Sequence, residues 1–251
     1  MGTQGEEKMT LARAEDIVQL CERQNCIKYM GFLTPAEAEI IRRNLPKATV
    51  QVTFFGGYPD AERTLFVALP TYLEPQDAAQ LVSVVEITGR EVGTLRHPDF
   101  LGSLLGLGIR REKIGDILTL EDRCLVFVEE NIADYVAENL DKVGRKGVKV
   151  RRVEIDEVEI PPRRVENINA TVAGLRLDCV VAAAARTSRS AALSYISEGR
   201  VFVNWAEEDS PSFKMKPGDV FSVRGLGRFR LTEEIKETKK GRLSVCIEKM
   251  V

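Results

Sequence analysis

The chain has 251 residues, of which 44% are hydrophobic and 29% are charged, and its formal net charge is −2 at pH 7. These values are typical of a soluble globular protein with two or three small domains, and no apolar run approaches the roughly 20 residues that a membrane-spanning helix needs. Five cysteines and a single histidine, His97, argue against a disulfide framework and against a metal site. We therefore expect a cytoplasmic protein without a membrane span, a metal or a cofactor.

The order of helix and strand patterns along the chain predicts an α+β protein. Residues 1–75 predict a small N-terminal α/β domain of two helices and a hairpin. Apolar residues recur at helical spacing from Leu11 to Gln24. The run Thr34-Pro35-Ala36-Glu37 has the N-cap, the first-position proline and the third-position glutamate of a helix start. Apolar residues on both sides of a glycine-containing turn, at 50–54 and 63–69, predict the hairpin.

Residues 76–158 predict a ferredoxin-like plait. Strand and helix patterns follow one another in the order βαββαβ, at about 82–88, 98–107, 114–120, 123–128, 131–143 and 148–155. This split βαβ arrangement is RRM-like and occurs in many RNA-binding modules, although the fold alone does not establish a function.

A basic loop, Gly108 to Lys113, follows the first helix of the plait. Its cations Arg110, Arg111 and Lys113 are candidates for RNA phosphate contacts, and a solvated surface is an equal alternative. The preceding Gly106-Leu107-Gly108 does not form a dinucleotide-binding loop. The third glycine is missing, and the glycines end a helix instead of opening one after a strand.

The C-terminal part of the chain differs from the rest in charge. From Pro161 to Val251 there are 16 Lys/Arg and 11 Asp/Glu residues, a net of +5, whereas the first 160 residues carry a net of −7. A nonspecific polyanion binder is usually more basic overall, so the asymmetry predicts contact with a particular structured RNA. The proline-containing segment 159–164 predicts a linker ahead of a domain at 165–251.

Two short helices joined by a basic turn dominate this last domain. An apolar stripe from Leu177 to Ala184 predicts the first helix, Ser188 is a good N-cap for the second, and Gly199 is placed to end it before a strand at 201–204. Free N–H groups and the helix dipole favour a phosphate at the start of the second helix. We predict a phosphate cradle built by Arg176, Arg186, Thr187, Ser188, Arg189 and Ser190. An ordinary helix cap with solvated arginines is the alternative.

Short motifs follow one another through this region: Arg176-Leu177-Asp178, Thr187-Ser188-Arg189-Ser190, Gly199-Arg200-Val201, Val203-Asn204 and Gly218-Asp219. Their order and spacing resemble the S-four RNA-binding domain, over roughly Thr171 to Thr232. The chain departs from that family at Ala191, where a glutamate often completes a capping box. Within this domain we assign further RNA contacts to Arg200, Asn204, Lys214, Lys216, Arg224 and Arg228.

Other motifs run through the first two domains: Gly56-Gly57-Tyr58, Ala61-Glu62-Arg63, Leu95-Arg96-His97, Asp99 to Gly102, Leu105 to Ile109, Arg111 to Lys113 and Gly115-Asp116-Ile117. Together with the ending Ser222 to Arg228 they resemble the YlmH family, whose members have an N-terminal domain, a plait and a C-terminal S-four domain. The chain departs at Pro98, where the family commonly has arginine. The resemblance implies a ribosome-associated RNA-binding factor in the rescue of stalled large subunits, encoded beside bacterial cell-division genes.

Three functions fit these patterns. The first is a non-catalytic protein that binds structured ribosomal RNA or tRNA at the large ribosomal subunit. The second is an RNA-modifying enzyme such as a pseudouridine synthase, which uses the aspartate of an Arg-Leu-Asp motif. Arg176-Leu177-Asp178 spells that motif, but it is already assigned to the RNA-binding helix. The third is an adapter for cell-division proteins. We predict the first function, without enzymatic activity.

Overall fold

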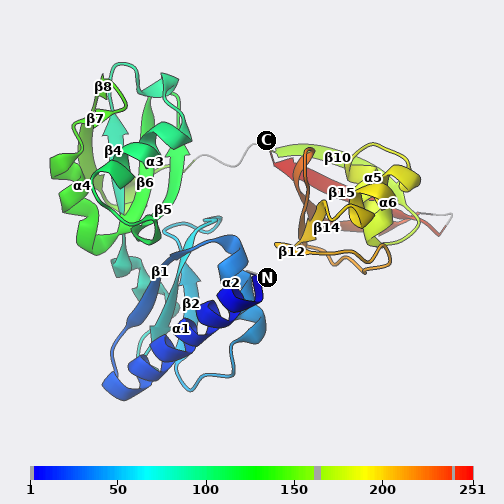
Figure 1. The fold of residues 1–251 in the computed structure, drawn as a ribbon, viewed down its shortest axis with the longest axis horizontal. Helices are drawn as coiled ribbons and strands as arrows, with labels where there is room; N and C mark the ends of the chain where they lie inside the picture. Colours follow the sequence, from blue (N-terminus) through cyan, green and yellow to red (C-terminus); the bar gives the residue numbers. More distant parts are fainter. Residues whose placement is uncertain (1–2, 161–164, 239–240, 251) are drawn as a thin grey trace. The chain divides into compact units, whose positions relative to one another are not determined.

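The computed structural model describes residues 3–160, 165–238 and 241–250. The chain divides into two compact units, Met1–Glu159 and Ile160–Val251 (Figure 1). Both units combine helices with antiparallel sheets, which confirms the predicted α+β class. The prolines of the predicted linker, in 161–164, lie outside the described residues. No helix in the described ranges has the length and apolar character needed to cross a membrane.

The N-terminal sheet has three antiparallel strands in the order β1-β3-β2. Its elements are α1 (Thr3–Gln24), β1 (Lys28–Leu33), α2 (Pro35–Asn44), β2 (Gln51–Phe55) and β3 (Thr64–Leu69). The central strand β3 is buried along its whole length, and its Phe66 and Ala68 pack in one core with side chains of α1 and α2. The sequence pattern missed β1. Gly31 interrupts its apolar alternation, and a Cβ at that position would lie 2.6 Å from the carbonyl oxygen of Glu112.

The plait forms a four-stranded antiparallel sheet in the order β5-β6-β4-β9. This order confirms the ferredoxin-like prediction, because each helix crosses over one intervening strand. Its elements are β4 (Val82–Thr88), α3 (His97–Gly106), β5 (Ile114–Thr119), β6 (Arg123–Glu129), α4 (Ala133–Asn139), the hairpin β7 (Lys142–Val143) and β8 (Lys146–Gly147), and β9 (Lys149–Val153). Short 3-10 turns connect them at η1 (Pro75–Leu81), η2 (Val92–Thr94), η3 (Arg111–Lys113), η4 (Glu130–Ile132) and η5 (Ile155–Glu157). Helix α4 ends four residues before the predicted limit of Val143, because Lys142 and Val143 form strand β7 of the hairpin.

Within the first unit, Asp116 on β5 holds the chain that follows β2. Its carboxylate accepts hydrogen bonds from Tyr58 Oη at 2.7 Å, Glu62 N at 2.7 Å and Arg63 N at 3.0 Å. Arg63 then donates to the carbonyl oxygen of Phe32 at 2.6 Å. These residues belong to motifs that the sequence marked out, and the contacts give them a role in joining the N-terminal sheet to the plait.

The second unit contains a six-stranded antiparallel sheet in the order β10-β15-β14-β13-β11-β12. Its elements are β10 (Val165–Val172), α5 (Leu177–Ala184), α6 (Arg189–Ser197), β11 (Val201–Val203), β12 (Ala206–Glu207), β13 (Val220–Val223), β14 (Gly227–Glu237) and β15 (Leu243–Met250). The two helices and the first strand after them are confirmed. The sequence did not predict β12, β13 and β14, nor β10, which pairs with β15 over eight residues.

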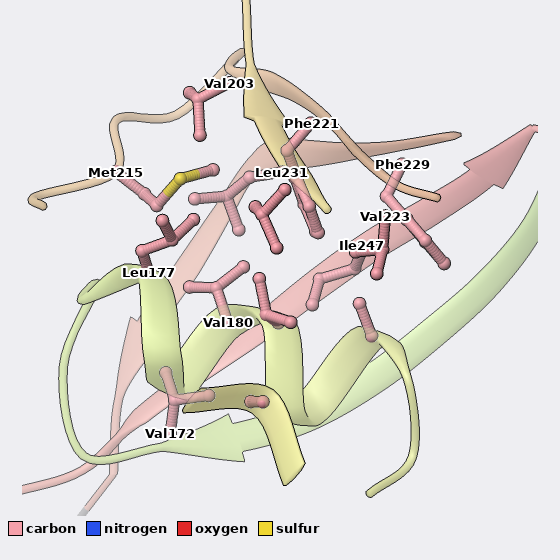
Figure 2. Packing of buried hydrophobic residues seen from close by; sticks show 14 of the residues in the cluster. Val172, Leu177, Val180, Val203, Met215, Phe221, Val223, Phe229, Leu231 and Ile247 are labelled. Carbon is pink, nitrogen blue, oxygen red and sulfur yellow. The ribbon is translucent and has the colours of Figure 1, made fainter. Parts of the chain in front are cut away.

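The core of the second unit lies between the two helices and one face of the sheet (Figure 2). Leu177 and Val180 of α5 meet Phe221 of β13, Phe229 of β14 and Ile247 of β15. All five side chains are fully or almost fully buried. Because this core fixes α5 and α6 against the sheet, the turn between the two helices has a defined place on the surface.

Candidate RNA-binding site

The turn between α5 and α6 is fixed by the end of one helix and the start of the next. At the end of α5 the chain reverses through a Schellman motif, in which Thr187 N donates to the carbonyl oxygen of Ala182 at 3.0 Å. Arg186 takes the left-handed position of that motif, with φ +49°. Ser188 then caps α6, because its Oγ accepts from Ala191 N at 3.2 Å. The predicted N-cap is therefore confirmed.

Asp178, in the first turn of α5, lies at the centre of the site. Its side chain is only 2% exposed. The carboxylate accepts from Arg176 Nε at 3.1 Å and from Arg189 Nε at 2.7 Å, and Arg189 Nη2 lies 2.6 Å away. Cys179 N donates a further hydrogen bond at 3.0 Å. One buried carboxylate thus joins the arginine before α5 to the arginine that opens α6.

The charges of this cluster leave an excess of one positive charge. Burial acts to raise the pKa of Asp178, but the hydrogen bonds from Arg176 and Arg189 outweigh it and hold the pKa below its ordinary value. The carboxylate is therefore ionised at neutral pH beside two cations. The arginine side chains are 46% and 56% exposed, and within the described residues neither Nη1 has a hydrogen-bond partner. Each arginine keeps a donor for an anion.

Other predicted RNA contacts differ in how close they lie to this pair. Lys214 forms an isolated antiparallel bridge with Arg176 and is exposed. Ser188 Oγ and Ser190 Oγ are 2.8 Å apart on the first turn of α6. Arg186 instead turns to β10, where its Nη2 donates to Glu166 Oε1 at 2.7 Å. The structure therefore brings Arg176 and Arg189 together at Asp178, places Lys214 opposite Arg176 in the backbone, and engages Arg186 elsewhere.

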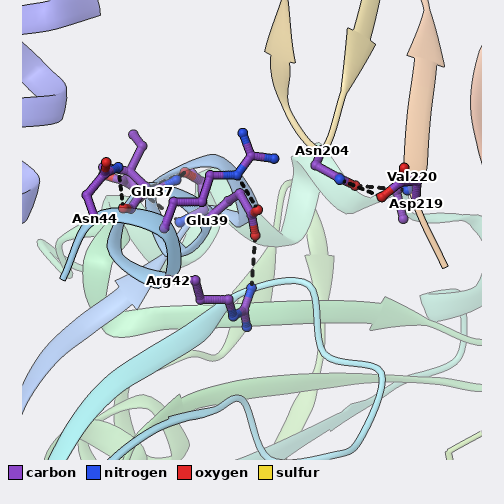
Figure 3. A network of polar contacts seen from close by, with 10 residues as sticks. Glu37, Glu39, Arg42, Asn44, Asn204, Asp219 and Val220 are labelled. Carbon is purple, nitrogen blue, oxygen red and sulfur yellow. Dashed lines mark hydrogen bonds and ion pairs between the residues drawn. The ribbon is translucent and has the colours of Figure 1, made fainter. Parts of the chain in front are cut away.

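Asn204, another predicted contact, has its side chain engaged in the fold. It sits with φ +46° in the two-residue turn between β11 and β12. Its Nδ2 donates to Asp219 Oδ1 at 2.9 Å, and its Oδ1 accepts from Val220 N at 3.0 Å (Figure 3). Lys216 is exposed, and its backbone N donates to the same Asp219. These bonds give Asn204 the role of tying the turn to β13.

The remaining predicted contacts of this unit lie away from the α5–α6 turn. Arg200 follows α6 at its C-terminal end and donates to the carbonyl oxygen of Arg224 at 2.8 Å. Arg224 follows β13 and is exposed. Arg228 lies on β14, opposite Ser222 of β13. These arginines form no part of the Asp178 cluster.

The basic loop of the plait has one cation on the open surface. Arg110 is 71% exposed and pairs with Glu112 at 2.9 Å. Arg111 turns inward to the carbonyl oxygen of Ile114, and burial, followed by the nearby charge of Arg63, lowers its pKa to about 10. Lys113 Nζ lies 2.9 Å from Glu129 Oε2. Arg110 and Lys113 line a pocket of about 370 Å³ with Leu107, Gly108, Ile109, Ile132 and Tyr135.

Sequence reasoning named the arginines of the site but missed the residue that positions them. In the sequence, Asp178 stands out only as the aspartate of the Arg-Leu-Asp motif. A carboxylate in the first turn of an apolar helix, two residues after an arginine, is the signal that points to such a contact. Its second partner, Arg189, is 11 residues away, so the pairing depends on how α6 packs against α5.

Comparisons with known proteins agree with this architecture. Residues 75–157 match the family model described as "Putative RNA-binding domain in YlmH", and residues 175–221 match the S4 domain, which is the S-four domain named above. A Bacillus subtilis protein named ribosome-associated protein quality control protein P2 is 31% identical over 245 residues, covering 97% of this chain and 95% of that protein. A solved structure, the cell division protein ylmH from Streptococcus pneumoniae, is similar in fold, with a TM-score of 0.52 and 19% identity over 61% of this chain and 93% of that chain.

Proposed function

Because the chain belongs to the YlmH family, we propose that it is a non-catalytic, cytoplasmic protein that binds structured ribosomal RNA or tRNA. The observation that carries the proposal is the pair of arginines that Asp178, in the first turn of α5, holds together. The name of the Bacillus subtilis relative assigns that protein to ribosome-associated quality control. We extend this role to the present chain, with the large ribosomal subunit as its partner and the rescue of stalled subunits as its task.

The Asp178 cluster and the start of α6 together offer RNA phosphates three kinds of donor. Arg176 and Arg189 supply guanidinium N–H groups, which bind phosphate with strong, charge-assisted hydrogen bonds. The first backbone N–H groups of α6, at Arg189 and Ser190, have no acceptor within the helix, and the helix dipole favours an anion beside them. Lys214 adds an exposed positive charge beside Arg176. Such contacts position a protein on an RNA backbone without reading bases.

The state of Asp178 supports a binding role over catalysis. A pseudouridine synthase would need this carboxylate free to meet its substrate. Here the side chain is 2% exposed, and Arg176 and Arg189 occupy its two oxygens. The same contacts are what a phosphate-binding pair needs, because they orient both guanidiniums before the RNA arrives.

Sedimentation with purified bacterial large ribosomal subunits tests the proposal. The full-length wild-type protein should sediment with the subunits, and RNase treatment should release it. Arg189→Ala should bind at least tenfold more weakly. Arg242→Ala removes an exposed arginine of the same unit whose Nη2 donates to a backbone oxygen of Thr171. This control should bind like the wild type. If the protein still sediments with the subunits after RNase treatment, and Arg189→Ala sediments as well as the wild type, the proposal is overturned in favour of a protein-binding adapter.

A further inference from the structure

At the C-terminal end of α6 two arginines stack on two aromatic rings. Gly199 ends the helix with φ +65°, and Arg200 N donates back to the carbonyl oxygen of Tyr195 at 3.0 Å. This return places the Arg200 guanidinium over the Tyr195 ring, 4.6 Å from its centroid. Next to it, the Arg224 guanidinium lies over Phe202, 5.6 Å from its centroid. Both distances are within the range of cation–π contacts.

The two stacks are locked together through the backbone. Arg224 N donates to the carbonyl oxygen of Arg200 at 2.8 Å, and Arg200 Nη2 donates to the carbonyl oxygen of Arg224 at 2.8 Å. Phe202 points away from the core, because its neighbours Val201 and Val203 on β11 are the buried ones. The four side chains therefore form one aromatic–arginine platform on the surface of the C-terminal unit, defined here as Tyr195, Arg200, Phe202 and Arg224.

The charge of the platform is only partly neutralised. Arg200 pairs with Glu198 at 3.2 Å. Arg224 is exposed and has no carboxylate partner among the residues that the structure describes. A guanidinium that lies on a ring keeps its second face and its N–H edge open. A planar base can stack on that face while a phosphate or a carbonyl group meets the edge, and proteins use such guanidinium planes for unpaired RNA bases.

We infer that the aromatic–arginine platform binds one unpaired nucleotide of the RNA, with its base stacked on Arg224. The inference rests on the proposed function and adds the class of RNA. Arg189 opens α6 and the platform lies at its C-terminal end, a separation of about 12 Å along the helix. In this arrangement the α5–α6 turn binds phosphates of a base-paired region, and the platform binds an unpaired base that is no longer stacked within the RNA helix. The preferred RNA is a duplex that adjoins a bulge, loop or single-stranded end.

Two RNA probes of equal length test this inference on the full chain: a single-stranded oligoadenylate and a blunt RNA duplex. Arg224→Lys keeps the charge but removes the planar face, and Phe202→Leu removes the ring that orients it. Each should weaken binding of the oligoadenylate about five- to tenfold, which is the lower range for loss of one stacked base. Binding of the duplex should change by less than about twofold. Arg242→Lys, the same exchange at another exposed arginine of the unit, should leave both affinities unchanged.

The outcomes separate the platform from the proposed function. Three results would each refute base binding by the platform. Arg224→Lys could bind the oligoadenylate as tightly as the wild type does, a platform variant could lose equal affinity for both probes, or the wild type could fail to bind the oligoadenylate. If Arg189→Ala still loses duplex binding in that case, the proposed function stands without it. If neither Arg224→Lys nor Arg189→Ala changes any affinity, both proposals fail. Melting curves should be recorded for all variants. Arg224→Lys should have the melting temperature of the wild type, because Arg224 lies at an exposed position.

Discussion

Arg189 and Asp178 form an ion pair between the surface and the core of the C-terminal unit. Arg189 Nη2 lies 2.6 Å from Asp178 Oδ2, and the side chains are 56% and 2% exposed. An arginine at an exposed helix end is usually free to change rotamer, and ordering it on a ligand costs entropy. Here the buried carboxylate has already ordered it. The pair therefore explains how a solvent-exposed guanidinium can be ready to bind a phosphate.

Arg189→Ala should lower RNA affinity and thermal stability together. The loss of a charged hydrogen bond to phosphate predicts about ten- to hundredfold weaker binding. Seen from the sequence alone, Arg189 lies on an exposed helix end, and its loss should scarcely affect stability. The structure changes this expectation, because Asp178 would lose one of its two cations and remain buried. Affinity titration and a melting curve of the same variant check both effects.

Arg189→Lys and Arg186→Ala are the matched comparisons. Lysine restores a charge beside Asp178 but not the forked N–H edge, so affinity should recover only in part. Arg186→Ala removes an exposed ion pair with Glu166 and should leave the melting temperature unchanged. If Arg189→Ala and Arg186→Ala have identical effects on affinity and melting, the special position of Arg189 is refuted.

Asp178→Asn should destabilise the C-terminal unit by about 1–3 kcal/mol, although the side chains have the same shape. The amide cannot neutralise Arg176 and Arg189, and its NH₂ group meets donors instead of acceptors. Without the carboxylate both arginines lose their fixed orientation, so RNA affinity should fall as well. Denaturant unfolding of the variant measures the first effect. An unchanged unfolding midpoint with weaker RNA binding would contradict a structural role for Asp178.

The stabilising effect of Asp178 should depend on pH in one direction. Its pKa is lower in the folded protein than its ordinary value, which is about 3.9 in an unfolded chain. The ion pairs therefore contribute their full stability above the unfolded pKa and lose it as pH falls through the folded pKa. The difference in unfolding free energy between wild type and Asp178→Asn should be constant from about pH 5 to 8 and shrink below about pH 4. A difference that grows as pH falls would have the wrong sign.

The plait should add to binding through Arg110. Arg110 is the exposed cation of the basic loop. A second weak contact made by a tethered domain raises the overall affinity through effective concentration. Arg110→Ala should weaken sedimentation with large subunits by about three- to tenfold. Its melting temperature should be that of the wild type, since the pair with Glu112 is exposed. Wild-type affinity in this variant would restrict RNA binding to the C-terminal unit.

The sequence predicted most of the fold because its elements follow local rules. The plait strands alternate apolar residues, and Thr34 and Ser188 are N-caps that act within their own helices. The sequence did not predict the elements whose structure depends on a contact with a distant part of the chain. Gly31 in β1 is required by the backbone of Glu112, and β10 exists because it pairs with β15. The same distinction between local and long-range information applies to the candidate site. The cations were visible in the sequence, but Asn204 is engaged by Asp219 and Arg111 by Ile114, contacts that only tertiary structure supplies.

The salt dependence of RNA binding tests the central claim most directly. A protein that neutralises several RNA phosphates releases counterions, so the logarithm of its affinity falls linearly with the logarithm of salt concentration. We predict a steep slope for the wild type on large-subunit RNA, a slope smaller by about one for Arg189→Ala, and an unchanged slope for Arg242→Ala. Affinity that stays constant from low to moderate salt, or equal slopes for the wild type and Arg189→Ala, would contradict phosphate binding at the α5–α6 turn.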